Sequence, residues 1–446
     1  MTLCRVAVIG AGVTGLTAAY RLLQRGYHVR VLEAGEAPGG LLRTFEVGGE
    51  SLECFYHHAF TSDTALIGLI DELGLSHTMA WQPSRVGVFH DGCLFPFSTA
   101  IDLLRFSPVP PLDRLRLGLM AMRLRREGDG SRFDGIAASE WVRRNAGQRA
   151  LDVVWQPLLR GKFGEMAGAV AMTWLWNKVH LRFASRAGGL FGGETLGYPT
   201  GSFAVWIDAL VGRILELGGE VQTGRAVELI EARGDGFVVD PGGSEEEFDA
   251  VVATVASQRF LDMAPDLPES YSAPLRAIRY QDALCVSLVL KRPLTSFYWL
   301  NMSDESVPFV AIVEHTNLVG SDRYGGRHIV YVSNYVSPQS SLVAKSVDEL
   351  FDLYEPHLRR INPAFDRSWV IERRLHHGRD AQPVFAVGAE RRIAPHRTPV
   401  PGLYLANMAQ IYPQDRGQNF AILMGDRVAT MVASDLGREK AKAYQV

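Results

Sequence analysis

The chain has 446 residues, of which 47% are hydrophobic and 21% charged, ordinary values for a globular protein of two or three structural units. Its formal net charge of −3 argues against a general nucleic-acid binder, and no apolar run approaches the roughly 20 residues of a membrane span. The apolar start of the chain lacks a basic leader, so we expect no signal peptide and a cytoplasmic location. Four widely separated cysteines without metal-ligand spacing predict reduced thiols and no metal site.

The first 33 residues follow the order of a dinucleotide-binding βαβ unit. Residues 4–9 form an apolar strand pattern, a glycine-rich turn follows, residues 16–26 have helical spacing, and residues 27–32 return to strand before Glu33. In this context the G-x-G-x-x-G pattern is a strong signal for a dinucleotide site.

Each position of the turn has a physical role. Gly10 permits the tight bend, Gly12 lets the backbone approach a pyrophosphate, and Gly15 allows the helix to pack on the strand. The amides of Val13, Thr14 and Gly15 open the helix and favour an anion. Glu33 is placed to accept hydrogen bonds from ribose hydroxyls and would repel a 2′-phosphate.

The remaining predicted elements alternate between helices and strands. Helical spacing covers residues 112–126, 203–217 and 419–434. Strand patterns fall at residues 249–255, 284–290, 297–301, 307–313, 329–332 and 402–406.

The segment from Glu33 to Thr44 resembles the second conserved stretch of the amine oxidase, protoporphyrinogen oxidase and phytoene desaturase superfamily of flavoproteins. The resemblance implies FAD rather than NAD as cofactor. It also implies close approach of Gly39 and Gly40 to the cofactor and places Arg43 near its phosphates. Their neighbours Ala34, Leu41 and Leu42 are further cofactor-binding candidates.

The resemblance continues toward the end of the chain. Residues 198–221 look like the family's helix before the strand that meets adenine, which implies a backbone contact from Val227. Residues 401–407 resemble the strand that ends beside the flavin phosphates and ribityl chain. Many relatives have Gly-Asp where this chain has Ala406-Asn407, and Asn407 can still bond a ribityl hydroxyl.

The fold implied is α/β, with a discontinuous Rossmann-like FAD-binding domain and an inserted α+β substrate domain. We expect residues 1–90, 190–262 and 386–446 in the FAD-binding domain, and residues 91–189 and 263–385 in the substrate domain.

Two segments are expected to frame the flavin ring. His58-Ala59-Phe60-Thr61 resembles a stretch of UDP-galactopyranose mutase, which implies that His58 lies near the reactive N5 edge and that His57 and Tyr56 line the substrate channel. The alternative for the histidine pair is a polar strand end without a role in catalysis. The second segment precedes the last helix, whose amides can face the pyrimidine carbonyl of the flavin. Its cofactor-binding candidates are Asp415, Arg416, Gln418 and Asn419.

The substrate side contains cations and aromatic residues. Residues 155–164 resemble a substrate-domain stretch of the family, which makes Arg160 and Lys162 binding candidates. With Lys178, Arg182, Arg186, Trp174 and Trp176 they suit an anionic head group, although a solvated helix face over a tryptophan-rich core explains them equally.

Three residues complete the candidate set. Trp299 is a further substrate-binding candidate. Glu314 and His315 are candidates for proton handling, and a structural hydrogen bond is the alternative for that pair.

The leading functional hypothesis is an FAD-dependent oxidoreductase that removes a hydride from a C–N or C–C bond of a small or lipophilic metabolite. One alternative is a redox-neutral flavin-dependent mutase of a sugar nucleotide, and another is a flavin-binding scaffold without turnover. We expect a small-molecule substrate, anionic or lipophilic, and no nucleic-acid partner. The basic, leucine-rich residues 112–126 are typical of a core helix with a charged outer face, with peripheral docking on an anionic membrane as the alternative.

Overall fold

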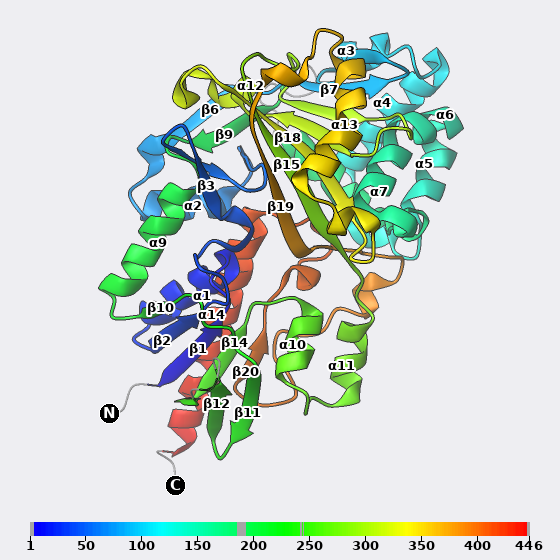
Figure 1. Ribbon diagram of the computed structural model, residues 1–446. Helices are drawn as coiled ribbons and strands as arrows, with labels where there is room; N and C mark the ends of the chain where they lie inside the picture. The colour runs from blue at the N-terminus through cyan, green and yellow to red at the C-terminus, as the bar shows by residue number, and fades with distance from the viewer. Residues whose placement is uncertain (1–3, 185–192, 241–242, 244, 444–446) are drawn as a thin grey trace.

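The computed structural model describes residues 4–184, 193–240, 243 and 245–443. A parallel sheet occupies the half of the molecule that carries both termini, and a larger mixed sheet occupies the other half (Figure 1). Strands and helices alternate along much of the chain, so the predicted α/β class is confirmed.

The parallel sheet has the strand order β10-β2-β1-β14-β20, and all its neighbours run parallel. Its strands are β1 (Arg5–Ile9), β2 (His28–Leu32), β10 (Glu220–Gln222), β14 (Ala250–Ala253) and β20 (Leu403–Leu405). In β1, Val6 and Val8 pack into one apolar core and Ala7 and Ile9 into another. Both faces are therefore buried, which explains why these strands are continuously apolar.

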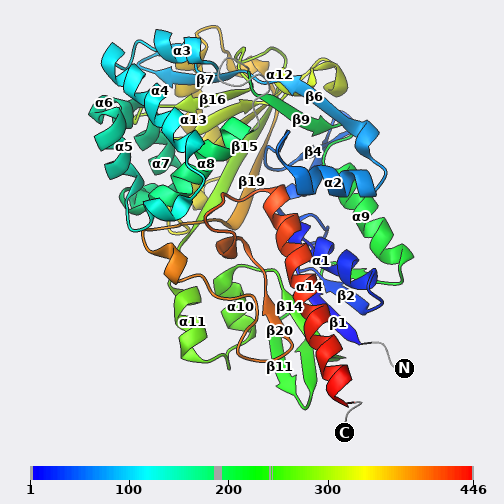
Figure 2. The ribbon, with the colours of Figure 1, turned by 180° about the vertical axis from the view of Figure 1, so that it is seen from behind.

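Helices cover the two faces of this sheet (Figures 1 and 2). One face carries α1 (Val13–Leu23), α9 (Ala204–Glu216) and α14 (Gln418–Ala443). The other face packs on α10 (Ser257–Met263), α11 (Glu269–Arg276) and a small sheet of β11 (Leu229–Arg233), β12 (Gly236–Asp240) and β13 (Glu246–Phe248).

The mixed sheet has the order β19-β15-β18-β17-β16-β7-β8. Its strands are β7 (Val86–His90), β8 (Cys93–Pro96), β15 (Tyr280–Leu290), β16 (Trp299–Met302), β17 (Ala311–Glu314), β18 (His328–Val336) and β19 (Val370–Pro383). Along β15, Leu284, Val286 and Leu288 face the core under α13 (Val347–Ile361), whereas Ala283 and Cys285 face the opposite core. This period of two directs one face of the sheet toward the parallel sheet and the helical layer.

A layer of helices packs beside the mixed sheet (Figure 2). They are α3 (Ala100–Arg105), α4 (Pro111–Arg126), α5 (Ala138–Ala146), α6 (Gln148–Ala150), α7 (Gln156–Phe163) and α8 (Met172–Ala184). Smaller elements complete the fold: α2 (Thr64–Glu72), α12 (Thr316–Val319), the pair β3 (Thr44–Val47) and β4 (Glu50–Glu53), and the sheet of β5 (Ala59–Phe60), β6 (Met79–Pro83) and β9 (Thr195–Pro199).

Most predicted elements are present, with two differences. The predicted helices at 112–126, 203–217 and 419–434 correspond to α4, α9 and α14. The strand predicted over 307–313 begins only at Ala311, because Pro308 lacks the amide that a ladder needs. Strand β19 was not predicted: it is a polar edge strand, and such strands lack the apolar signal of central ones.

The domain limits stay predictions. Strand β7, at residues 86–90, pairs with β16 in the mixed sheet, although it falls in the range predicted for the first FAD-domain piece.

Candidate cofactor and substrate site

The glycine-rich turn connects the carboxyl end of β1 to α1. Gly10 has φ +101°, in the region that favours glycine, and its amide donates to the carbonyl of Leu32 at 2.8 Å. A Cβ added to Gly15 would lie 1.9 Å from the carbonyl oxygen of Gly10. Both positions are therefore closed to side chains, for the reasons that the sequence predicts.

Gly12 is open where its neighbours are closed. A Cβ added there meets no heavy atom of the described chain within 4 Å. Helix α1 begins at Val13, so the amides of Val13, Thr14 and Gly15 have no acceptor within the helix. An open space before unpaired amides at a helix amino terminus is the geometry that binds a pyrophosphate.

The second conserved stretch, residues 33–44, packs against this glycine-rich turn. The amide of Gly39 donates to the carbonyl of Ala11 at 2.8 Å, and a Cβ on Gly40 would lie 3.2 Å from the Cα of Gly12. The Glu33 carboxylate accepts the amides of Ala11 at 2.7 Å and Gly35 at 2.8 Å. It is thereby oriented at the end of β2, with lone pairs left for ribose hydroxyls.

The cofactor-binding candidates on this second stretch differ in exposure. Leu42 is buried, while Arg43 is exposed and donates to the carbonyl of His377 at 3.0 Å. Ala34, directly after Glu33, is exposed, and Leu41, directly after Gly40, is partly buried.

Val227 lies beside the Glu33 loop. The amide of Arg225 donates to the carbonyl of Glu33 at 2.8 Å, and Val227 itself is buried. Neither of its backbone groups has a hydrogen-bond partner among the described residues. A buried residue with a free amide and carbonyl suits recognition of an adenine edge.

The side chain of Asn407 forms hydrogen bonds to other residues of the protein. Its side-chain amide donates to the carbonyl of Val255 at 3.1 Å and to the hydroxyl of Ser257 at 3.2 Å, and its oxygen accepts the amide of Ala409 at 3.0 Å. These bonds join the ends of β14 and β20 beside the turn. The ribityl contact of Asn407 stays a prediction. Taken with the open cradle at Gly12 and the free backbone groups at Val227, the residues present fit FAD.

A second group of candidates forms a buried charged cluster. One oxygen of Asp415 accepts hydrogen bonds from Lys162 of α7 at 2.5 Å and from Lys178 of α8 at 2.8 Å. Next to it, Arg416 donates to Gln382 at 3.1 Å and to the hydroxyl of Tyr335. The cluster joins the helical layer to the loop before α14.

The charges of the cluster do not cancel. Burial alone would raise the pKa of Asp415, but the Lys162 and Lys178 ammonium groups outweigh it and hold that pKa well below its usual range. Burial lowers the pKa of Lys162 and lowers that of Lys178 to about 8, and the Lys162 ammonium group lowers the pKa of Lys178 further, although Asp415 opposes both effects. Lys178 and Arg416 are both cationic at neutral pH, so the positive charge of the cluster exceeds what the single Asp415 carboxylate neutralises.

Tyr56, His58 and Trp299 are brought together near this cluster. The Tyr56 hydroxyl accepts a hydrogen bond from Ser333 at 3.0 Å, and its ring lies edge-on to Trp299 with centroids 5.0 Å apart. Nδ1 of His58 lies 2.9 Å from the Tyr298 hydroxyl, and the His58 ring is 6.1 Å from that of Trp299.

The two adjacent histidines are both neutral at pH 7. Burial lowers the pKa of His58 to about 3 and that of His57 to about 4. Nδ1 of His57 lies 2.7 Å from the Phe55 carbonyl. A neutral imidazole can position a substrate, but it does not act as a cationic acid.

Two of the predicted residues, Arg160 and Asn419, have their partners outside this cluster. Arg160 is exposed and pairs with Glu305 at the surface, because residues two apart on a helix face nearly opposite sides. The side-chain oxygen of Asn419 accepts the Ala65 amide at 2.8 Å and so caps α2. Gln418 is buried, with its side-chain oxygen unpaired among the described residues. Arg186 lies outside the described residues.

Glu314 and His315 are enclosed. The Glu314 carboxylate accepts the Leu294 amide at 3.0 Å and both the amide and hydroxyl of Thr295, at 2.6 and 3.0 Å. Burial raises the pKa of Glu314 to about 7 and lowers that of His315 to about 3. Nε2 of His315 lies 2.9 Å from the Tyr324 hydroxyl. These bonds are those of structural groups, and proton handling stays a prediction.

Sequence reasoning missed several members of the site, among them Tyr298, Ser333, Tyr335 and Gln382. Tyr331, Ser333 and Tyr335 share one face of β18, so extending the strand pattern beyond residue 332 would have found two of the missed residues. Gln382 lies on the polar edge strand β19 and carried no signal.

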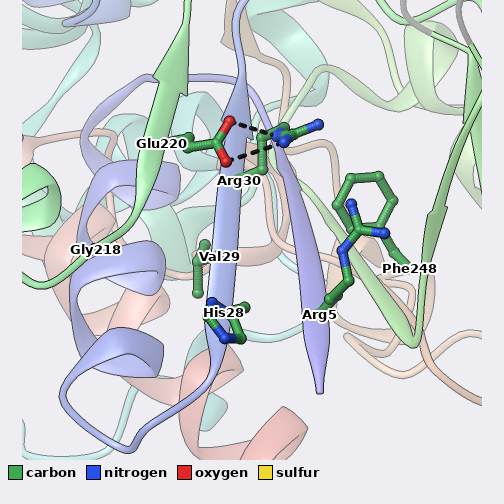
Figure 3. A pocket seen from close by; sticks show the side chains of 7 residues that line it. All are labelled: Arg5, His28, Val29, Arg30, Gly218, Glu220 and Phe248. Atoms are coloured by element: carbon green, nitrogen blue, oxygen red, sulfur yellow. Dashed lines mark hydrogen bonds and ion pairs between the residues drawn. The ribbon is translucent and has the colours of Figure 1, made fainter. Parts of the chain in front are cut away.

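A surface hollow of about 300 Å³ lies at the opposite end of the parallel sheet. Figure 3 shows its lining around the first residues of β1 and β2, with Arg30 paired to Glu220 at 2.8 Å. Dinucleotides bind at the carboxyl ends of such strands, so this hollow is separate from the cofactor site.

The structure also bears on metals and membranes. Within the described ranges, no three His, Cys, Asp or Glu side chains gather as metal ligands. All four cysteines are unpaired. No helix in the described part of the chain is long and apolar enough to cross a bilayer.

Comparison with known proteins assigns the family. Residues 13–433 match the family of flavin containing amine oxidoreductases. Protoporphyrinogen oxidase 2 of Arabidopsis thaliana is 28% identical over 184 residues, which cover 39% of this chain and 36% of that protein. A putrescine oxidase and a phytoene desaturase are also relatives, so the predicted resemblance is confirmed. The first curated relatives are matched over only 36% to 60% of their own length.

Solved structures agree on the fold. Wild-type putrescine oxidase bound to putrescine is 18% identical with a TM-score of 0.73, covering 97% of this chain and 99% of that one. Reduced UDP-galactopyranose mutase is 17% identical with a TM-score of 0.75, covering 97% and 96%. At these identities the likeness shows the fold alone. The chain belongs to the flavin containing amine oxidoreductase family, and its cofactor is FAD.

Proposed function

We propose that this protein is an FAD-dependent oxidoreductase that removes a hydride from a C–N or C–C bond of a small or lipophilic metabolite carrying an anionic group. When bound, FAD supplies the hydride acceptor. The observation that carries the substrate class is the sharing of one Asp415 oxygen by Lys162 and Lys178.

The charge balance supports an anionic substrate. Two ammonium groups and the Arg416 guanidinium face a single carboxylate in a buried setting, so a carboxylate or phosphate of the substrate would complete the neutralisation. Lys178 is the more accessible of the two lysines, with 23% of its side chain exposed against 10% for Lys162. It is therefore the lysine that we assign to the substrate.

The aromatic residues support the placement of the reacting part. Tyr56 and Trp299 supply apolar surface, and His58, held by Tyr298, supplies a neutral polar group. In this proposal the chain positions the substrate and excludes water, and the neutral histidine orients rather than ionises.

A redox-neutral mutase of a sugar nucleotide is the second candidate. The packing of His58 against Trp299 and the cationic cluster favour it, because a diphosphate would neutralise the lysines as well as a carboxylate does. A scaffold without turnover would keep the FAD cradle and need neither the cluster nor His58.

The first test is the absorbance spectrum of the purified protein, followed by anaerobic reduction and re-exposure to air. A flavin spectrum with fast reoxidation supports an oxidase and directs screening to anionic amines and hydroaromatics. A reduced form that persists in air favours a dehydrogenase or the mutase, and sugar nucleotides are then screened. A colourless protein that FAD cannot reconstitute contradicts the proposal.

Substitution of His58 separates turnover from scaffolding. His58→Ala is expected to retain FAD and to slow flavin reduction by about 10- to 100-fold, since misplacing a substrate costs that much. Unchanged kinetics would remove His58 from the site. His77→Ala, which removes an exposed histidine outside the candidate site, is the control.

A further inference from the structure

Helices α3 and α4 lie at the end of the molecule far from both termini (Figures 1 and 2), and they carry exposed apolar and basic side chains. Five of the twelve large apolar side chains that are exposed in the described chain lie on these two helices. We call them the apolar face: Ile101, Leu104, Leu112, Leu115 and Leu119, which are 51 to 61% exposed. Single exposed leucines are ordinary, but such a concentration marks an interaction surface.

Helix α4 has two apolar faces. Leu117, Met120 and Leu124 are buried against the other helices of the layer. Leu112, Leu115 and Leu119 recur at spacings of three and four on the opposite side and stay exposed. The buried leucines account for the packing of α4, so the exposed ones need a separate explanation.

The two helices present one continuous surface. Helices α3 and α4 are in contact, and a Cβ added to Gly118 would lie 3.8 Å from Leu103. On α3, Ile101 and Leu104 are three residues apart and both exposed, so they extend the leucine row of α4.

Arginines border the exposed row. Arg116, Arg123 and Arg126 follow it at helical spacing and are exposed. Residues 100–126 contain six arginines and two aspartates, whereas the whole chain has a net charge of −3. The positive charge is therefore concentrated where the aliphatic side chains are exposed.

We propose that the apolar face docks on the surface of a bilayer that contains anionic phospholipid. The leucines and Ile101 enter the boundary between head groups and acyl chains, while the arginines contact the phosphates. The helix stays in the fold, because its inner face remains packed. This inference does not depend on the substrate or on turnover.

The test is co-sedimentation of the FAD-loaded protein with vesicles. Wild type is expected to bind vesicles of phosphatidylglycerol and phosphatidylcholine, and to bind phosphatidylcholine alone much less. The variant L112S/L115S/L119S is expected to lose roughly tenfold or more in partitioning. R116Q/R126Q should lose binding chiefly at low salt.

A matched control separates the face from general surface change. Leu215 and Leu217 on and beside α9 are 53% and 47% exposed, so L215S/L217S removes similar exposed leucines elsewhere and should bind as wild type. All variants should keep the flavin spectrum and melting temperature of wild type. Equal sedimentation of the triple leucine variant and wild type would overturn the proposal. So would a wild type that ignores vesicles and forms a dimer that the same variant abolishes, which would assign the face to a second copy.

Discussion

The glycine-rich turn and the lysine cluster are built in opposite ways. At the turn, Gly10, Gly12 and Gly15 act through backbone groups and through the absence of side chains. At the cluster, side chains from α7, α8 and the loop before α14 meet around Asp415. The residues that the turn accepts are limited by space. The residues that the cluster accepts are limited by the balance between burial and charge. Substitutions should therefore fail for steric reasons at the first region and for electrostatic reasons at the second.

The largest effect is expected at Gly15. Gly15→Ala places a Cβ 1.9 Å from the Gly10 carbonyl, so helix and strand must move apart, at about 3 kcal/mol or more. We expect a large fall in the denaturation midpoint together with loss of FAD.

Gly12→Ala is the matched control for Gly15. Its Cβ meets nothing in the described protein, so the fold should keep its denaturation midpoint while FAD affinity falls. If both variants fold equally well, the steric account of the turn is wrong.

Asp415→Asn is expected to lower the free energy of unfolding by about 3 kcal/mol at pH 7, because it leaves two buried ammonium groups without a counter-charge. Chemical denaturation of wild type and variant measures this difference. It should shrink as the pH rises above 8, where Lys178 loses its charge. A constant difference across that range would show that charge is not the cause.

Lys178 should give the wild type a pH-dependent stability. Its pKa falls from 10.5 to about 8 on folding, so between these values the unfolded chain binds more protons. Stability from this group therefore rises with pH across that window, by about 2 kcal/mol after allowance for its partial exposure. Lys178→Met should flatten the profile between pH 8 and 10, whereas Arg160→Met, which removes a surface cation paired with Glu305, should leave the window in place.

The smallest effect is expected at Glu314. Glu314→Gln weakens hydrogen bonds to Leu294 and Thr295 and should cost about 1 kcal/mol, with little change in turnover once a substrate is known. The reverse result, normal stability with turnover lost, would return Glu314 to the chemistry.

The two regions also differ in how far the sequence predicts them. The turn depends on spacing within one short stretch, so Gly10, Gly12, Gly15 and Glu33 could be placed from the pattern alone. The cluster depends on long-range packing: Asp415 is 253 residues from Lys162, and no local pattern reports that contact. The prediction for Arg160 lacked the same long-range information, because Lys162 and not Arg160 is the residue of α7 that contacts Asp415.

The order of strands in the parallel sheet has a consequence for synthesis on the ribosome. Strand β14 is entirely apolar and borders β20, which is made about 150 residues later in the chain. Until then the nascent protein carries an unprotected strand edge, of the kind that invites aggregation. Yield in a heterologous host should therefore depend on chaperones that hold the growing chain until residues 403–443 emerge.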